Sequence, residues 1–82
     1  MAVTFVNSSW NHVNIQVRIG NNENAESNPL VSQFGLERYH SSPPFAFDVF
    51  LFWRRDSNPD SPNGTYDTWT QESAGWDRDV TV

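Results

Sequence analysis

Hydrophobic and polar residues alternate over several stretches of this chain, and a period of two is typical of half-buried β-strands. The most regular stretch covers residues 12–19, where four β-branched hydrophobic side chains share one face and two amides and an arginine share the other. Residues 2–6 alternate in the same way, and the turn-forming cluster at 7–11 separates the two stretches. We therefore predict that these two strands form a hairpin.

The stretch from residue 45 to residue 55, FAFDVFLFWRR, holds four of the six Phe residues. As one strand it is hydrophobic from Phe45 to Trp53 on one face, and it places Phe50 and Phe52 next to each other on the opposite face. A strand that is hydrophobic on both faces is usually central in a sandwich, or is covered by a partner. We interpret residues 45–55 as the central strand, with Trp53 in the core.

The remaining segments are shorter. Residues 65–72 and 76–82 alternate as strands, while 20–29 and 56–64 are polar loops rich in Asn and Pro. Residues 30–40 are ambiguous, because they fit a strand pair bent at Gly35 and also allow one helical turn. The pattern predicts that residues 1–82 form a single all-β domain, a compact antiparallel β-sandwich of about six strands.

Charge and composition narrow the classes of partner. The chain has five Arg, no Lys and ten acidic residues, giving a net charge of −5, so we expect no nucleic-acid partner. No hydrophobic run approaches the ~20 residues that span a bilayer, so we expect no membrane insertion. The first residues lack the charged and hydrophobic regions of a signal peptide, which indicates a cytoplasmic protein or one secreted without a recognisable signal.

The chain also lacks cysteine, so no disulfide stabilises this small domain. Domains of this size often gain stability by oligomerisation. If Phe50 and Phe52 are exposed in the monomer, they form a natural interface. We therefore predict a homodimer.

Few residues suit catalysis or metal binding. There is no Cys or Lys, and the two His lie far apart in the sequence, so we expect no enzyme activity. Asp56, Asn58, Asp60 and Asp67 have the spacing of calcium ligands, but the required Gly and Glu are missing and two prolines stiffen the loop. We favour a loop with Asx turns, and expect neither metal nor cofactor.

Aromatic and polar residues gather in the C-terminal third, and this combination is typical of sugar sites. Galactose has a hydrophobic face that stacks on indole, and its hydroxyls hydrogen-bond to planar polar groups. Trp69 lies between polar residues on its predicted face, which favours a ligand platform, whereas Trp76 suits the core equally well. Trp10 and His12 form a second candidate platform. The candidate carbohydrate-binding residues are Asn63, Tyr66, Asp67, Trp69, Trp76, Asp77, Trp10 and His12.

Three segments also carry a resemblance: VTFVNSS at residues 3–9, VNIQVR at 13–18 and FWR at 52–54. In these segments, and in size, the chain resembles the small fungal α-galactosyl-binding lectins. The resemblance implies a dimeric lectin for terminal α-galactosyl glycans, but it carries over no individual binding residue. The alternative hypothesis is an acidic protein-interaction or inhibitor domain that uses Phe50 and Phe52.

Overall fold

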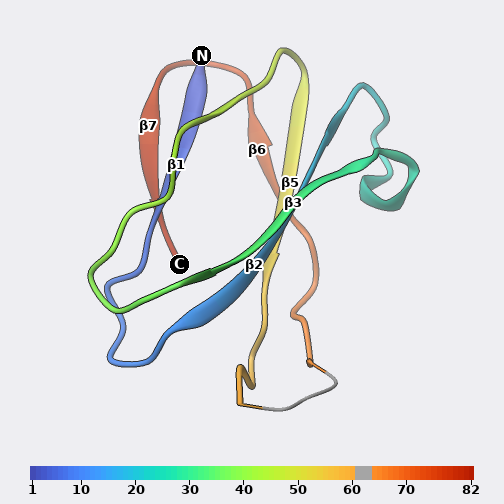
Figure 1. The fold of residues 1–82 in the computed structure, drawn as a ribbon. Coiled ribbons are helices and arrows are strands. Elements are labelled where there is room, and N and C mark those ends of the chain that lie inside the picture. The colour runs from blue at the N-terminus through green and yellow to red at the C-terminus, as the bar shows by residue number, and fades with distance from the viewer. Residues whose placement is uncertain (61–63) are drawn as a thin grey trace.

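Two β-sheets pack face to face in the computed structural model, which describes residues 1–60 and 64–82 (Figure 1). The elements are β1 (Ala2–Val6), β2 (Val13–Gly20), the 3-10 turn η1 (Ala25–Ser27), β3 (Leu30–Leu36), β4 (Phe45–Ala46), β5 (Phe50–Arg55), β6 (Thr70–Ser73) and β7 (Arg78–Thr81). One sheet has the order β4–β1–β7 and the other β3–β2–β5–β6. The predicted all-β sandwich is confirmed.

The connections between strands differ from the prediction in two ways. The predicted hairpin of the first two strands is wrong, because β1 and β2 belong to different sheets and the chain crosses the sandwich between them. In addition, β1 pairs with β7 in parallel, whereas all the other strand pairs are antiparallel. The parallel pair arises because the β6–β7 turn also crosses between the sheets, so β7 starts at the end where β1 starts (Figure 1).

The predicted central strand is in fact two strands in two sheets. Residues 45–46 form β4 beside β1, and residues 50–55 form β5 between β2 and β6. The chain passes from one sheet to the other at residues 47–49, where Phe47 is buried while Asp48 and Val49 are exposed. Within β5 the predicted alternation is confirmed, since Leu51 pairs with a core-facing residue of β2 and Phe52 pairs with Arg18 on the outer face.

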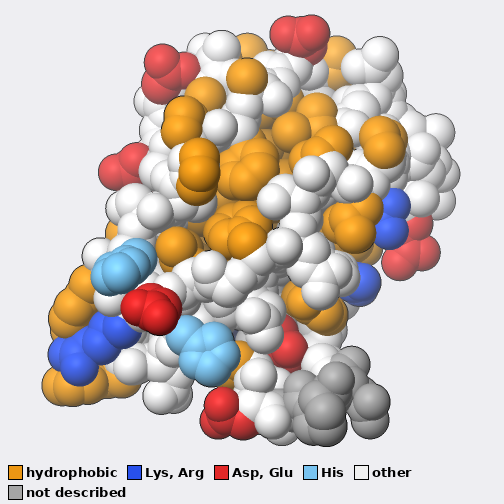
Figure 2. Space-filling model, in the orientation of Figure 1, with side chains coloured by type: hydrophobic (Ala, Val, Ile, Leu, Met, Phe, Trp, Pro, Cys, Tyr) orange, Lys and Arg blue, Asp and Glu red, His pale blue; other side chains and the backbone are white. Residues whose placement is uncertain are grey.

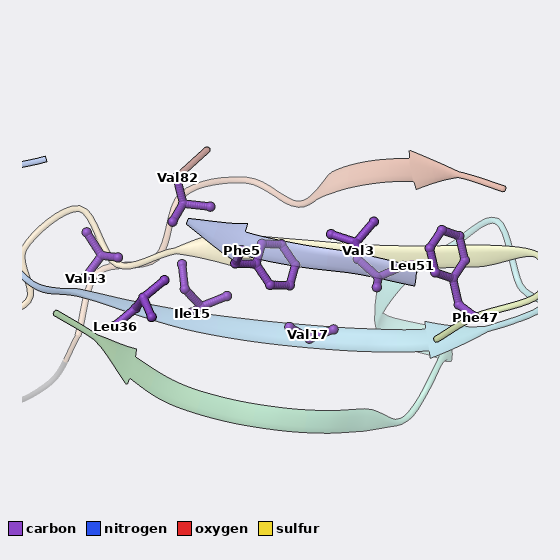
Figure 3. Close-up of a cluster of buried hydrophobic side chains, with 9 residues drawn as sticks. All are labelled: Val3, Phe5, Val13, Ile15, Val17, Leu36, Phe47, Leu51 and Val82. Atoms are coloured by element: carbon purple, nitrogen blue, oxygen red, sulfur yellow. The ribbon is translucent and has the colours of Figure 1, made fainter. Parts of the chain in front are cut away.

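The core lies between the sheets and takes side chains from both (Figure 3). At its centre is Phe5, whose ring lies 5.7 Å from that of Phe45 and 5.8 Å from that of Trp53, measured between centroids. Trp53 therefore packs against the core, as predicted. The buried cluster consists of Val3, Phe5, Val13, Ile15, Val17, Leu36, Phe47, Leu51 and Val82.

Acidic and hydrophobic side chains occupy different parts of the surface. Figure 2 shows hydrophobic side chains gathered in the centre of one face, with acidic side chains towards its edge. A pocket of about 510 Å³ lies between β3 and β4 and is walled by Phe34, Leu36 and Phe45. Among the described residues, no helix has the length and hydrophobicity needed to cross a membrane.

Candidate functional site

Two loops meet at one end of the sandwich and enclose a polar pocket of about 260 Å³. The β1–β2 loop contributes two polar side chains to this pocket, those of Asn11 and His12. The β5–β6 loop contributes Asp67 from the opposite side. Two residues that were predicted as sugar ligands from distant parts of the sequence, His12 and Asp67, therefore line one pocket. Its other lining residues are Ser9, Val13, Arg55, Asp56, Ser57 and Pro59.

The side chain of Asn7 fixes the β1–β2 loop. It is fully buried, and its Nδ2 donates to the carbonyl oxygens of Asn11 at 2.8 Å and Leu36 at 2.9 Å. Its Oδ1 accepts hydrogen bonds from the backbone N–H of Ser9 at 2.9 Å and from the Ser9 hydroxyl at 2.6 Å. All the bonds tie the loop to itself or to β3. Asn7 therefore sets the position of Asn11 and His12 in the pocket.

Asp56 fixes the β5–β6 loop in a similar way. It is only 3% exposed, and its Oδ1 accepts hydrogen bonds from the backbone N–H groups of Asn58 and Thr65, each at 2.9 Å. The Thr65 bond is the main cause that lowers the pKa of the Asp56 carboxyl, against the opposing effect of burial. The backbone N–H of Asp67 donates to the carbonyl of Arg55 at 2.8 Å, which places Asp67 at the pocket.

This use of Asp56 bears on the calcium-like spacing of the loop. One oxygen of its carboxylate is engaged by two backbone amides, as in an Asx turn. Among the residues that the structure describes, no three His, Asp or Glu side chains come together as a metal site would require. In the described part of the loop, Asp56 is bonded as in a turn.

Charged groups line the pocket, and an exposed aromatic side chain lies in one of its two loops. The Arg55 Nε lies 3.7 Å from a carboxylate oxygen of Asp67, and both side chains are partly exposed. Trp10 lies in the same loop as His12 and is 76% exposed. The Arg38 guanidinium carbon is 3.3 Å from the centroid of its ring, so one face of the indole rests on a cation. The pocket can thus accept and donate hydrogen bonds, and the loop that carries Asn11 and His12 also carries an exposed aromatic ring.

Tyr66 and Trp69, from the predicted C-terminal cluster, lie on the other side of the β5–β6 loop. Both rings stack on Arg54, at 5.0 Å and 4.4 Å from its guanidinium carbon. Burial raises the pKa of the Tyr66 hydroxyl, the charge of Asp56 raises it further, and Arg54 opposes both. Trp69 is therefore outside the core, as expected, but guanidinium groups cover its ring.

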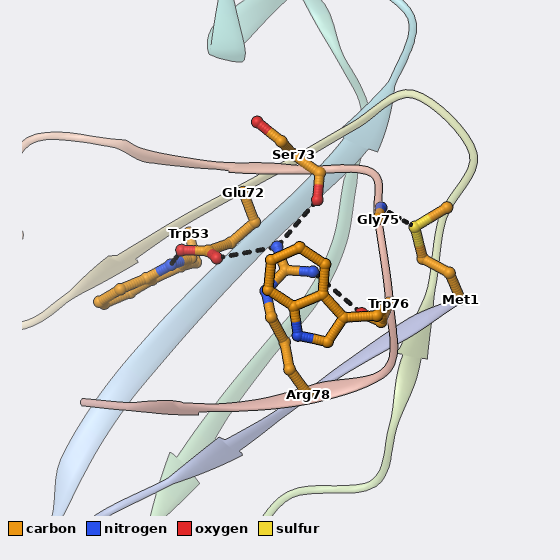
Figure 4. Close-up of polar contacts among 7 residues, drawn as sticks. All are labelled: Met1, Trp53, Glu72, Ser73, Gly75, Trp76 and Arg78. Carbon is orange, nitrogen blue, oxygen red and sulfur yellow. Dashed lines mark hydrogen bonds and ion pairs between the residues drawn. The ribbon is translucent and has the colours of Figure 1, made fainter.

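Trp76 lies at the turn between β6 and β7, near Met1 (Figure 4). Asp77 follows it in the same turn, and its carboxylate lies 3.9 Å from the N-terminal nitrogen. Trp76 is 69% exposed, which excludes it from the core. Arg78 holds the turn by donating to the carbonyls of Ser73 at 2.8 Å and Trp76 at 3.0 Å. The Asp77 carboxylate accepts a hydrogen bond from the backbone N–H of Ala2 at 2.8 Å.

The predicted site residues thus fall into three places, and Asn63 lies outside the described residues. Sequence reasoning missed Asn11, Arg55 and Ser57 at the pocket. Asn11 sits between two predicted residues and was within reach of the sequence, whereas Arg55 required the knowledge that the two loops meet. Comparisons with protein-family models, curated proteins and solved structures find no match for this chain. The function must therefore be inferred from the geometry.

Proposed function

We propose that the protein is a lectin that binds terminal galactosyl glycans, α-galactosyl ones in particular, without catalysis. The observation that supports this best is the pocket between the two loops, which Asn11, His12 and Asp67 all line. Carboxylate, amide, imidazole and guanidinium groups match the donor and acceptor pattern of sugar hydroxyls. The preference for galactose comes from the resemblance to small fungal lectins.

In this proposal each group has a separate role. The Asp67 carboxylate and the Asn11 side chain accept hydrogen bonds from sugar hydroxyls, and Arg55 donates to a hydroxyl oxygen while keeping Asp67 in place. Trp10 offers its exposed ring to the hydrophobic face of a sugar, while Arg38 supports the ring from behind. Asn7 and Asp56 hold the two loops at the required separation before the sugar arrives.

The test measures retention on immobilised galactose and affinity for a methyl α-galactoside. Trp10→Ala should lower the affinity by about five- to 150-fold, because stacking on one aromatic ring contributes roughly 1–3 kcal/mol. Asp67→Asn should lower it about tenfold or more, because a hydrogen bond to a charged group contributes roughly 1.5–3 kcal/mol. Melting temperatures should stay near that of the parent, since both side chains are exposed.

Two matched controls come from elsewhere on the surface. Asp79→Asn removes an exposed carboxylate from β7, and Trp76→Ala removes an exposed Trp that also stacks on an Arg. Both should bind as the parent does. If Trp76→Ala abolishes binding and Trp10→Ala does not, the sugar site lies at the β6–β7 turn. If the parent passes straight through the galactose column, the lectin proposal is wrong.

The proposed lectin is a homodimer, but its interface is not the one expected. Phe52 is only 4% exposed, so it does not form an open patch with Phe50. This also removes the surface that the alternative, an inhibitor domain, was to use. The edge strand β3 is a better interface, because only β2 pairs with it and because Leu30 and Val31 are exposed there.

Sedimentation tests the dimer. The parent should sediment as a dimer at micromolar concentration, and Val31→Lys should convert it to a monomer. Val49→Lys is the control, because Val49 is similarly exposed but lies between β4 and β5. A monomeric parent would contradict the proposal, and equal effects of the two variants would place the interface elsewhere.

A further inference from the structure

We propose that the outer face of the four-stranded sheet holds a second site, which binds acidic saccharides through a sulfate ester or a carboxylate. The site consists of Arg18, Arg54 and Trp69 and is called here the arginine–tryptophan face. It rests on the proposed function only in taking a saccharide as the ligand. It is separate from the loop pocket, whose arginine is Arg55.

The two arginines come from neighbouring strands and meet at one ring. Arg18 of β2 pairs with Phe52 of β5, and Arg54 lies two residues further along β5 on the same face. The Arg18 guanidinium carbon lies 5.4 Å from the centroid of the Trp69 ring, and that of Arg54 lies 4.4 Å from it. Two positive charges are therefore less than about 10 Å apart.

Hydrogen bonds hold both guanidinium groups in place. The Arg18 Nη1 donates to the carbonyl of Asn28 at 2.7 Å. The Arg54 Nε donates to Gln16 Oε1 at 2.7 Å, and Gln16 Nε2 donates to Gln33 Oε1 at 3.1 Å. Within residues 1–60 and 64–82, these bonds leave the Arg54 Nη groups for a ligand. A site that is fixed before binding loses less conformational entropy when the ligand arrives.

The charge of this face is unusual for such an acidic chain. Arg55 and Arg78 each pair with a carboxylate, at 3.7 Å and 3.1 Å. Within residues 1–60 and 64–82, neither Arg18 nor Arg54 forms an ion pair, although the chain has twice as many acidic as basic residues. Two neighbouring cations repel each other, and a bound oxyanion would neutralise both.

The same face also contains donors that the fold does not use. Arg18 Nε and Trp69 Nε1 are buried, and neither has a hydrogen-bond partner among the described residues; the third such atom is Arg38 Nε, which stands outside this face. A sulfate or carboxylate provides several acceptor oxygens for guanidinium and indole N–H groups. Tyr66, stacked on Arg54, adds an aromatic ring beside the cations, which suits an oxyanion carried on a sugar ring.

The experiment compares galactose, galactose 6-sulfate and galacturonic acid by calorimetry at 50 mM and 300 mM salt, with sodium sulfate as a competitor. The parent should bind at least one acidic sugar tenfold more tightly than galactose, and this advantage should shrink at high salt. Preference for the sulfate or for the carboxylate identifies the oxyanion. Displacement by an oligoglutamate peptide as readily as by the acidic sugar would overturn the saccharide assignment.

Three variants locate the site. Arg54→Gln and Arg18→Gln should each abolish the advantage of the acidic sugar and leave galactose binding unchanged. Ala74→Asp is the matched control, because Ala74 is exposed in the β6–β7 turn, outside both proposed sites, and the change lowers the net charge by one, as Arg→Gln does. If Ala74→Asp has the same effect, the preference comes from net charge and the proposed site is wrong. If the parent does not bind galactose at all, that result would instead contradict the lectin proposal.

Discussion

Buried hydrogen-bond donors on the inner side of the sandwich find partners that some donors on the outer face of the four-stranded sheet lack among the described residues. Trp53 and Trp69 show the difference most directly. The Trp53 Nε1 donates to Glu72 at 3.1 Å, and the same carboxylate pairs with Arg78 (Figure 4). The Trp69 Nε1 is also buried but has no partner among the described residues.

This difference separates polar residues that stabilise the fold from those available for binding. A buried donor without a partner costs free energy, so a fold rarely keeps one without a reason. Asn7, Asp56 and Glu72 are each bonded within the fold, and we assign them to stability. Arg18, Arg38 and Trp69 retain donors without a partner among the described residues, and we place all three at proposed ligand sites. The following changes test that division.

The largest effect is expected at Asn7. Asn7→Ala removes the hydrogen bonds to Leu36 and Asn11 and leaves a buried carbonyl without its donor, which should lower the free energy of unfolding by about 2–4 kcal/mol. Urea denaturation measures this. Asn11→Ala, an exposed change in the same loop, should cost less than about 0.5 kcal/mol. Similar losses in the two variants would show that Asn7 does not hold the loop.

The next effect is expected on the inner face at Trp53. Trp53→Phe keeps an aromatic ring against Phe5 but removes the hydrogen bond to Glu72. The carboxylate keeps only Arg78, and the smaller ring leaves space in the core. We expect a loss of about 1–3 kcal/mol. For a domain of this size, that lowers the melting temperature by roughly 4–8 °C per kcal/mol. An unchanged melting temperature would contradict the assignment of Trp53 to the core.

The contribution of Asp56 to stability should be present at neutral pH and be lost in acid. Its pKa is lower in the folded state than its ordinary value of 3.8, so the carboxylate stabilises the fold above that pH. This stabilisation is lost as the pH falls through the folded pKa. Asp56→Asn should therefore lose less stability than the parent does as the pH falls below 3.8. Thermal melting at several pH values measures this difference. Asp60→Asn, an exposed control, should follow the parent curve.

The sequence predicted the strands better than their connections. Alternation identified the faces of β2 and β5 correctly, because local side-chain direction depends only on the period of two. It did not reveal that the chain changes sheet at residues 47–49, because Phe47 stays buried through the crossing and so continues the hydrophobic pattern. It also did not place His12 beside Asp67, since loops that are distant in sequence meet only through the fold.

The smallest effect is expected on the outer face at Trp69. Trp69→Phe removes less hydrophobic cover from the sheet than a change to Ala would, and it also removes the buried N–H that has no partner. The loss of buried area destabilises the fold, while the loss of the unpaired donor stabilises it by about 1–3 kcal/mol. The two terms oppose each other, so the net change should stay within about 1 kcal/mol.

Binding should respond differently from stability, because Trp69→Phe removes the indole N–H and weakens the stack with Arg18 and Arg54. We expect a three- to tenfold loss of affinity for the acidic sugar, with galactose binding unchanged. Melting curves compare the stability of Trp69→Phe and Trp53→Phe, and calorimetry compares their affinity for the acidic sugar. If both lose the same stability and neither loses acidic-sugar binding, then the Trp69 N–H has a partner in solution. The outer face would then be structural, like the inner one.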